Sequence, residues 1–206
     1  MKDVWTWVHA ERAALVADLA EVDAARWETP SLCPGWSVHD VVAHLVDNAR
    51  TTRLGIVRAM VRARFDFDRQ NADGVRRERG ATPAETLDRL RAVVTRTTTP
   101  PAPLDSRLVE EVVHGEDVRR PLGIAHTYAP TAVERALHYQ ARTSVSMGGA
   151  KQRIAGLRLE ATDAEIALGE AGGTVVRGPA VALLLAASGR TAALDDLSGA
   201  GVDALR

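Results

Sequence analysis

The chain is poor in cysteine, in aromatic residues and in net charge, and each shortage excludes a class of protein. Cys33 is the single cysteine among 206 residues, which excludes an intramolecular disulfide framework and fits a reducing cytoplasm. The 26 lysines and arginines nearly balance the 27 aspartates and glutamates, leaving a formal net charge of −1. With aromatic residues at only 4%, this balance argues against a nucleic-acid-binding surface and against a cationic partner.

Long hydrophobic runs are also missing. The longest one, from Ala180 to Ala187, is far shorter than the roughly 20 residues that a membrane-spanning helix needs. No apolar leader segment follows Met1. We therefore expect a cytoplasmic, soluble protein without membrane contact, as a monomer or homodimer. The length suffices for one large domain, or for a medium domain with a small appendage.

The apolar pattern over the first 150 residues is helical. Apolar residues recur at intervals of three and four, and Ser37 with Asp40 and Thr82 with Glu85 resemble capping boxes, which start helices. The pattern predicts helices over residues 3–26, 37–64, 82–94, 105–119 and 131–147.

Residues 65–81 mix charges with Gly74 and Gly80 and are expected to form a solvated connection. The alternative is that an arginine of this segment pairs with an anionic substrate, since a guanidinium matches a carboxylate. The candidates are Arg69, Arg76 and Arg77.

Beyond residue 150 the period changes from helical to alternating. Leu157, Leu159 and Ala161 alternate with polar residues, and Thr174 to Arg177 is a β-branched run. A short apolar helix follows Gly178-Pro179. We therefore expect a mainly α protein with a helical bundle over residues 1–150 and a small α+β domain over 151–206, with the boundary near 149–154.

One stretch carries residues with metal-binding chemistry. Glu110 and His114 are four residues apart, on one face of the predicted helix, where a carboxylate oxygen and an imidazole nitrogen can reach one divalent ion. His44, at the edge of the apolar stripe of the second helix, is the candidate third ligand. The alternatives are a solvated polar face for Glu110 and His114, and a hydrogen-bonded core-edge histidine for His44.

Cys33 is a candidate nucleophile, because it precedes a helix N-terminus and such positions lower the pKa of a thiol. It lies in the tight apolar turn Cys33-Pro-Gly-Trp, and no histidine need lie near it. We favour the interpretation as a packed small residue.

Four segments in order resemble the mycothiol-dependent maleylpyruvate isomerase family, within the DinB-like metal-binding bundles of actinobacteria. The likeness covers nearly the whole chain. The segments are Leu32-Cys-Pro-Gly-Trp-Ser-Val-His-Asp-Val-Val-Ala-His44-Leu, Phe65-Asp-Phe-Asp-Arg-Gln-Asn71, Glu110-x-x-x-His114-Gly-x-Asp117-x-x-x-Pro-Leu-Gly123 and Arg177-Gly-Pro-Ala-x-x-Leu-Leu-Leu-Ala-Ala-x-Gly-Arg190.

The resemblance implies a four-helix bundle that holds a divalent metal, usually zinc, and a small C-terminal domain similar to the sterol-carrier fold. Carried over to this sequence, the metal ligands are His44, Glu110 and His114. Asp117 is a candidate for orienting His114, since metal-bound imidazoles usually donate their other N–H to a carboxylate or carbonyl. In the C-terminal part, Arg177 and Arg190 are candidates for binding a substrate carboxylate.

Such a site fits thiol chemistry. A three-ligand zinc site keeps a fourth position open, and a thiol bound there loses its proton and becomes a strong nucleophile. We expect an isomerase or a thiol S-transferase that uses mycothiol on a small electrophilic substrate. The alternative is a non-catalytic protein of the same fold that binds a metal or a small ligand. The balanced charge disfavours a regulatory or nucleic-acid-interacting module.

Overall fold

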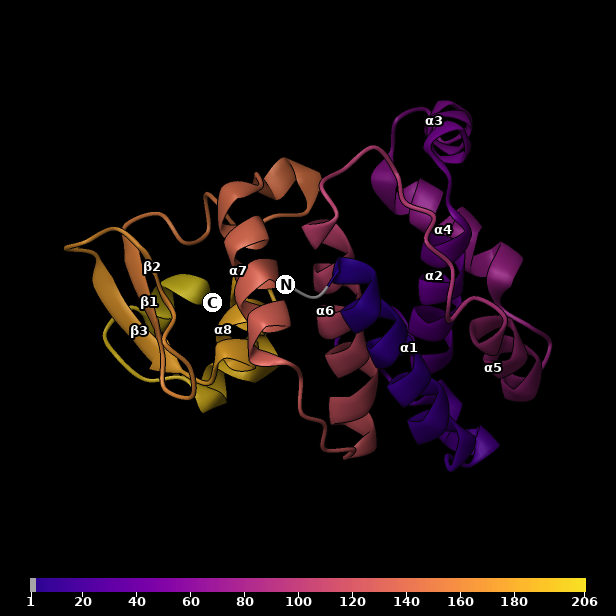
Figure 1. Cartoon of the computed structure of the whole chain (residues 1–206), viewed down its shortest axis with the longest axis horizontal. Coiled ribbons are helices and arrows are strands. Elements are labelled where there is room, and N and C mark those ends of the chain that lie inside the picture. Colours follow the sequence, from indigo (N-terminus) through magenta and orange to yellow (C-terminus); the bar gives the residue numbers. More distant parts are fainter. Residues whose placement is uncertain (1–2) are drawn as a thin grey trace. The chain divides into compact units, whose positions relative to one another are not determined.

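The computed structural model describes residues 3–206, and these divide between His126 and Thr127 into two compact units (Figure 1). The first unit is helical, and the second combines helices with a three-stranded sheet. The expected fold class, a mainly α protein with a helical bundle followed by a small α+β part, is confirmed. No helix within residues 3–206 is long and apolar enough to cross a membrane.

The first unit contains six α-helices and one short 3-10 helix, η1, among its described residues. Their bounds are α1 (Val4–Ala20), η1 (Ala24–Glu28), α2 (Val38–Arg50), α3 (Arg53–Arg62), α4 (Phe67–Glu78), α5 (Pro83–Arg91) and α6 (Asp105–Leu122).

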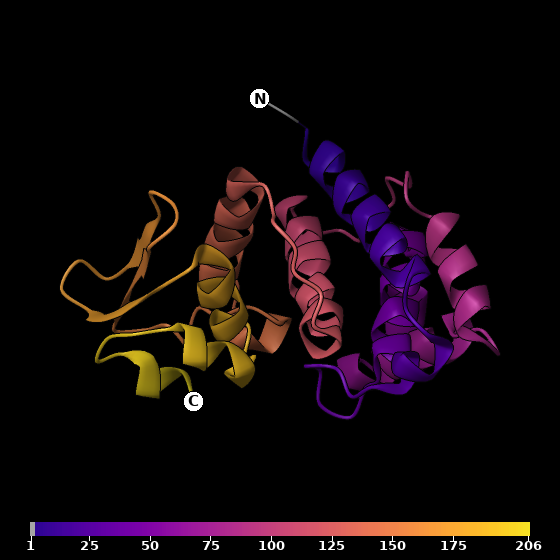
Figure 2. The ribbon, with the colours of Figure 1, turned by 90° about the horizontal axis from the view of Figure 1, so that it is seen from below.

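Four of these helices close into a bundle. α1 packs against α5 and α6, and α2 packs against the same two helices. Seen from below, α1 lies between α5 and α6 (Figure 2). The bundle is therefore made of α1, α2, α5 and α6, while α4 packs on the outer side of α2.

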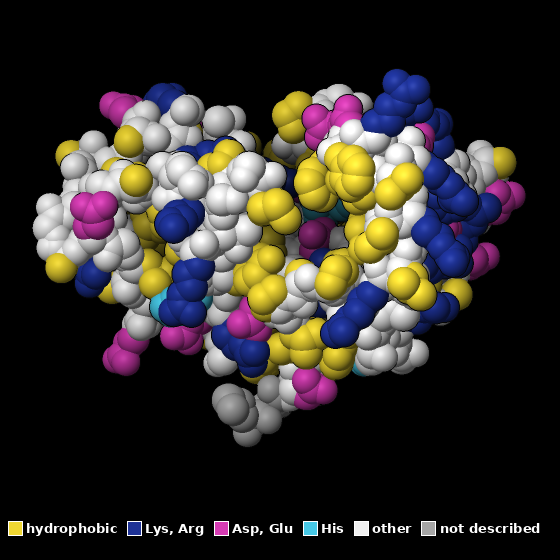
Figure 3. All heavy atoms as spheres, turned by 90° about the horizontal axis from the view of Figure 1, so that it is seen from above, with side chains coloured by type: hydrophobic (Ala, Val, Ile, Leu, Met, Phe, Trp, Pro, Cys, Tyr) yellow, Lys and Arg dark blue, Asp and Glu magenta, His cyan; other side chains and the backbone are white. Residues whose placement is uncertain are grey.

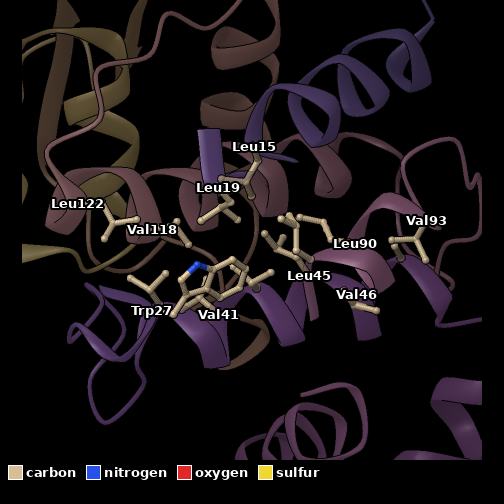
Figure 4. Packing of buried hydrophobic residues seen from close by; sticks show 14 residues of the cluster. Leu15, Leu19, Trp27, Val41, Leu45, Val46, Leu90, Val93, Val118 and Leu122 are labelled. Atoms are coloured by element: carbon tan, nitrogen blue, oxygen red, sulfur yellow. The ribbon is translucent and has the colours of Figure 1, made fainter. Parts of the chain in front are cut away.

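Helix α2 carries the centre of the core. Ten of its 13 residues are buried. Leu45 and its apolar neighbours on α2 meet Leu19 of α1, Trp27 of η1, Leu90 of α5 and Val118 of α6 (Figure 4). Full burial of one such side chain contributes roughly 1.5–3 kcal/mol to the stability of the folded protein. This packing sets the spacing between α2 and α6, the two helices that carry the predicted metal ligands.

The starts of α2 and α5 follow the capping chemistry expected from the sequence. The Ser37 hydroxyl accepts the Asp40 backbone N–H at 3.3 Å, and the Asp40 carboxylate accepts the Ser37 backbone N–H at 2.9 Å. Thr82 accepts from the backbone N–H of Glu85, and Pro83 occupies the first helical position of α5. Both helix starts are confirmed.

The single long helix expected over residues 37–64 is wrong, because it breaks at Thr51 and Thr52. The Thr51 hydroxyl donates to the Asp47 carbonyl at 2.8 Å, and Thr52 caps a new helix, α3, by accepting from Gly55. Side-chain hydroxyls that bond to the local backbone compete with helix continuation in this way. None of the α3 residues is buried. Figure 3 shows hydrophobic and basic side chains on the upper face, where α3 lies.

The connection expected over residues 65–81 is also wrong, because most of it forms helix α4. Asp66 caps this helix by accepting from the Arg69 N–H. Arg77 pairs with Asp47 of α2, and Arg76 pairs with Asp73. Arg77 therefore joins α4 to α2, whereas the Arg76 pair is exposed and lies within α4. A role of Arg69, Arg76 or Arg77 toward an anionic substrate stays a prediction.

Helix α6 runs one turn further than the expected 105–119. Pro121 lies in its last turn, and the helix ends at Gly123, whose left-handed conformation (φ 69°) favours glycine. The added residues lie beyond Asp117, so Glu110, His114 and Asp117 all fall within the part of the helix that the sequence predicts.

The second unit has the alternating strands expected from the sequence. The sheet order is β2-β1-β3, with β1 parallel to β3 and antiparallel to β2. Helix α8 packs against β1, β3 and α7. The elements are α7 (Pro130–Arg142), η2 (Val145–Met147), β1 (Leu157–Ala161), β2 (Ala167–Gly169), β3 (Thr174–Gly178), α8 (Ala180–Ala187), η3 (Thr191–Asp196) and η4 (Val202–Leu205).

Helix α7 was expected to belong to the bundle, as part of residues 1–150. Its contacts are with α8 and β2, and the division of the chain into compact units falls before it, after His126. Whether the chain folds as independent domains with the boundary near 149–154 stays a prediction.

Candidate metal centre

His44 reaches the centre of the first unit from the middle of α2. The residue is buried, and its ring packs against the ring of Trp36, with centroids 5.2 Å apart. The rings of His44 and His114 meet edge to face at 4.8 Å. The Nδ1 atom of His44 is buried and has no hydrogen-bond partner among residues 3–206. Packing between these rings therefore orients His44 without help from a side-chain hydrogen bond to Nδ1.

Glu110 and His114 face His44 from α6. Their spacing of four residues places them one above the other on the helix, as the sequence predicts. The Oε2 atom of Glu110 lies 3.4 Å from Nε2 of His114 and 3.6 Å from Nε2 of His44. The structure thus brings the three predicted ligands together from two helices.

The ligand atoms of these three residues all lie within 4.8 Å of one another. In a tetrahedral zinc site with bonds of about 2.0–2.1 Å, neighbouring ligand atoms are about 3.3 Å apart. The two Glu110 distances are close to that value. Moreover, Oε2 of Glu110 is buried and accepts no hydrogen bond from residues 3–206. A buried carboxylate oxygen that accepts no hydrogen bond is costly, so these residues fit a cation between them.

The cluster is not closed to solvent. Side-chain exposure is 10% for His44, 26% for Glu110 and 15% for His114. A structural zinc site has four protein ligands, whereas a catalytic one keeps a position open. With three candidate ligands that are partly exposed, this cluster resembles a catalytic zinc site more than a structural one.

The charges of Glu110 and His114 depend on one another. Burial tends to raise the pKa of Glu110, but the imidazoles of His114 and His44 and the Arg107 guanidinium outweigh it, and this pKa lies well below its ordinary value. Burial tends to lower the pKa of His114, but Asp117, Cys33 and Glu110 outweigh it, and this pKa lies well above its ordinary value. The cluster therefore stabilises positive charge next to the Glu110 carboxylate.

Asp117 lies on the other side of the His114 ring. Its Oδ2 atom is 2.8 Å from Nδ1 of His114, so Nδ1 carries the proton that is donated to the carboxylate. The Nε2 atom of His114 then points toward Glu110. This contact is the one expected for a carboxylate that orients a metal-binding histidine; that role stays a prediction.

Cys33 lies next to His114 and Asp117, a position that the sequence did not indicate. Its Sγ atom is 3.1 Å from Oδ2 of Asp117 and 3.8 Å from Nδ1 of His114. The premise that no histidine need lie near Cys33 is therefore wrong. Cys33, His114 and Asp117 form a second group of metal-binding type, but the 2.8 Å separation of His114 and Asp117 is that of a hydrogen bond.

Two further residues next to the cluster were not singled out from the sequence. Arg107 of α6 lies 3.9 Å from Oε1 of Glu110, through Nη2, and it donates through Nη1 to the side-chain oxygen of Asn48 on α2. Helical spacing was an available signal, because Asn48 follows His44 by four residues and Arg107 precedes Glu110 by three.

The two arginines proposed to bind a substrate carboxylate lie in the second unit. Arg177, on β3, pairs with Glu160 at 2.8 Å. Arg190 follows α8 and donates to the Ser188 carbonyl at 2.8 Å. Their role toward a substrate stays a prediction.

Comparison with known proteins agrees with the resemblance seen in the sequence. Residues 8–140 match the family described as the mycothiol maleylpyruvate isomerase N-terminal domain. Two solved structures are similar in fold: mycothiol-dependent maleylpyruvate isomerase and a mutant of it with one histidine replaced by alanine. Each has a TM-score of 0.66 at 19% identity, over 96% of this chain and 91% of the other. The search of curated proteins finds no match.

Proposed function

Because the chain belongs to the mycothiol maleylpyruvate isomerase family, we propose that it is a metal-dependent enzyme that activates a low-molecular-weight thiol, namely mycothiol. In an isomerisation, the thiolate adds to a conjugated double bond, the resulting single bond rotates, and the thiol leaves unchanged. In an S-transfer, the thiolate displaces a leaving group or opens a ring and stays attached to the carbon. The substrate is a small electrophile, and we expect the enzyme in the cytoplasm.

One observation carries this proposal. The buried Oε2 atom of Glu110 lies between the Nε2 atoms of His44 and His114, at 3.6 and 3.4 Å, and accepts no hydrogen bond from residues 3–206. His44, Glu110 and His114 would hold a divalent ion there, with zinc as the best match to a donor set of two imidazoles and one carboxylate.

A zinc ion held there would supply the positive charge that stabilises a thiolate near neutral pH. The protein side chains prepare the site for it. Asp117 keeps the proton of His114 on Nδ1 and leaves Nε2 available for coordination. The Trp36 ring packs on His44 and restricts its orientation. The partial exposure of Glu110 leaves room for a small molecule to approach.

The proposal is tested first by metal content. Elemental analysis of the purified chain, after zinc is supplied, should show about one equivalent of metal, as expected for a single three-ligand site. His44→Ala should lose it. His9→Ala is the matched control, because His9 is half-buried on α1, and its Nε2 atom has no hydrogen-bond partner to lose among the described residues. Absence of bound zinc in the unmodified protein, or full binding by His44→Ala, contradicts the metal site.

A second measurement separates an enzyme from a non-catalytic metal-binding protein of the same fold. The zinc-loaded protein is mixed with mycothiol and maleylpyruvate, and both the isomer and any thiol conjugate are followed by mass spectrometry. Turnover that requires the thiol and is lost in His44→Ala supports an isomerase. Conjugate formation supports a transferase. If zinc binds and a panel of electrophiles gives no product, the binding-protein alternative is correct.

A further inference from the structure

We propose that Arg107 and Asn48 form a clamp between α6 and α2 that positions Glu110 toward the cation. Both are positioning residues, since neither is one of the three ligands. The inference rests on the proposed function, because it assigns a role to these residues at the proposed metal site.

The clamp is defined by three contacts of one guanidinium group. Nη1 of Arg107 donates to Oδ1 of Asn48, Nε donates to the Ser106 hydroxyl at 3.4 Å, and Nη2 lies 3.9 Å from Oε1 of Glu110. The Arg107 side chain is only 5% exposed. Burying a guanidinium group destabilises a protein unless its charge and its N–H groups have partners. Here the partners come from both α2 and α6.

The contact lies one helical turn from the metal ligands on both helices. Asn48 follows His44 by four residues on α2, and Arg107 precedes Glu110 by three residues on α6. The two helices run antiparallel here, since His44 faces Glu110 while Asn48, later in α2, faces Arg107, earlier in α6. The Arg107 to Asn48 bond therefore fixes the spacing of α2 and α6 next to the point where the three ligands converge.

The guanidinium also makes the two oxygens of Glu110 unequal. Oε1 lies near Arg107, whereas Oε2 lies between the two imidazoles. With Oε1 attracted to a fixed positive charge, Oε2 is the oxygen that would be available to a cation held with the two imidazoles. Arg107 would thereby favour binding of the cation through one carboxylate oxygen.

The neighbouring residue of α6 offers a matched comparison. Glu111 accepts from Nε of Arg12 at 2.7 Å, and the two side chains are 4% and 2% exposed. This pair is also a buried arginine and glutamate, and it joins α1 to α6. It does not include a residue of the metal cluster, so its loss should affect folding alone.

The experiment measures zinc affinity by competition with a chromophoric chelator, in the full chain. Arg107→Lys keeps the charge but not the planar fork, and Asn48→Ala removes the acceptor. Each should weaken zinc binding by about 10-fold or more, as is typical when a group supporting a metal ligand is lost. The double variant should lose about as much as either single variant, because both disrupt one contact. Asn48→Asp keeps an acceptor oxygen and should restore binding.

Arg12→Lys is the control, because it tests whether replacing any buried arginine of this unit by lysine weakens zinc binding. Chemical denaturation of the metal-free proteins should show a loss of stability for Arg12→Lys. Its zinc affinity should stay within about twofold of that of the unmodified protein, because Arg12 donates to Glu111 and to the carbonyls of Val93 and Arg96 and to none of the three proposed ligands. Unchanged zinc affinity in Arg107→Lys and Asn48→Ala, with zinc still lost in His44→Ala, overturns the clamp and leaves the proposed function intact. An unmodified protein that binds no zinc overturns both.

Discussion

The Sγ atom of Cys33 lies 3.1 Å from Oδ2 of Asp117, the oxygen that also accepts the Nδ1 proton of His114 at 2.8 Å. The thiol donates to the carboxylate, since a carboxylate can only accept. The Leu32 N–H donates to the Asp117 carbonyl at 3.3 Å as well. The turn before α2 is therefore hydrogen-bonded to α6 at Asp117, the residue that also accepts from His114. We infer that the position of His44 and the orientation of His114 are linked.

Replacing Asp117 by asparagine should weaken zinc binding. The variant keeps the shape of the side chain but loses the charge that holds the His114 ring, and we expect a loss of about 10–100-fold in affinity. The measurement is chelator competition on the folded variant. Asp18→Asn is the control, because Asp18 accepts from Arg119 of α6 at 2.7 Å without being part of the metal cluster. Equal zinc affinity in Asp117→Asn and the unmodified protein contradicts the orienting role.

Two substitutions at Cys33 should separate a positioning role from a nucleophilic one. Cys33→Ser keeps a donor for Asp117, whereas Cys33→Val keeps a side chain of similar size without a donor. If the thiol positions Asp117, the valine variant should bind zinc about 10-fold more weakly and the serine variant nearly normally. A serine variant that binds zinc normally but has no turnover would instead make Cys33 the nucleophile.

The positions of the three proposed ligands could be predicted from the sequence only where helical spacing determines them. Glu110 and His114 share a helix, so their separation follows from the helical repeat. His44 lies on another helix, and its approach to Glu110 depends on how the apolar faces of α2 and α6 pack. The position of His44 at the edge of an apolar stripe made it a candidate, and the resemblance to a family supported its pairing with Glu110 and His114. Cys33 comes close to Asp117 for the same tertiary reason, and no local pattern indicated it.

Helix α4 was missed because its stability comes from partners on α2. Gly74 in its middle costs about 1 kcal/mol relative to alanine in a helix, and charges dominate its sequence. In the structure, Arg77 pairs with Asp47 and Glu78 pairs with Arg50, both across the contact with α2. Such long-range ion pairs leave no periodic apolar signal, so the segment was interpreted as a connection.

The close approach of α4 to α2 predicts that Gly74→Ala destabilises the protein, although alanine is the better helix former. A Cβ atom at residue 74 would lie 2.3 Å from Oδ2 and 2.7 Å from Cγ of Asp47. The overlap should cost about 1–3 kcal/mol, which exceeds the gain of about 1 kcal/mol in helix propensity. Urea denaturation measures the difference. Gly172→Ala is the control, because nothing lies within 4 Å of its Cβ position. A Gly74→Ala protein at least as stable as the unmodified one would contradict this prediction and show that the Asp47 side chain or the two helices move to admit the added methyl group.

Replacing Asp40 by asparagine should lower stability in a way that depends on pH. Partial burial tends to raise the pKa of Asp40, but hydrogen bonds from Ser37 and Arg79 outweigh it, so this pKa lies below its ordinary value of 3.8. A lowered pKa in the folded state means that the carboxylate stabilises the fold above the ordinary pKa of the unfolded chain. This contribution is lost as the pH falls through the folded-state pKa.

We therefore expect Asp40→Asn to reduce the free energy of unfolding by about 1–2 kcal/mol at pH 7, the usual range for a helix cap with a charged acceptor. The difference from the unmodified protein should persist down to about pH 5 and shrink as the pH falls from about 4 through the lowered folded-state pKa of Asp40, because the unfolded chain takes up the proton first and the folded protein follows. Asp88→Asn is the control: its side chain is 71% exposed beside Arg91, and a change below about 0.5 kcal/mol is expected for such a surface pair. The opposite outcome is a difference in the free energy of unfolding between the Asp40 variant and the unmodified protein that stays constant from pH 7 to pH 3. That result would contradict the prediction and show that the Asp40 charge does not contribute to the capping box.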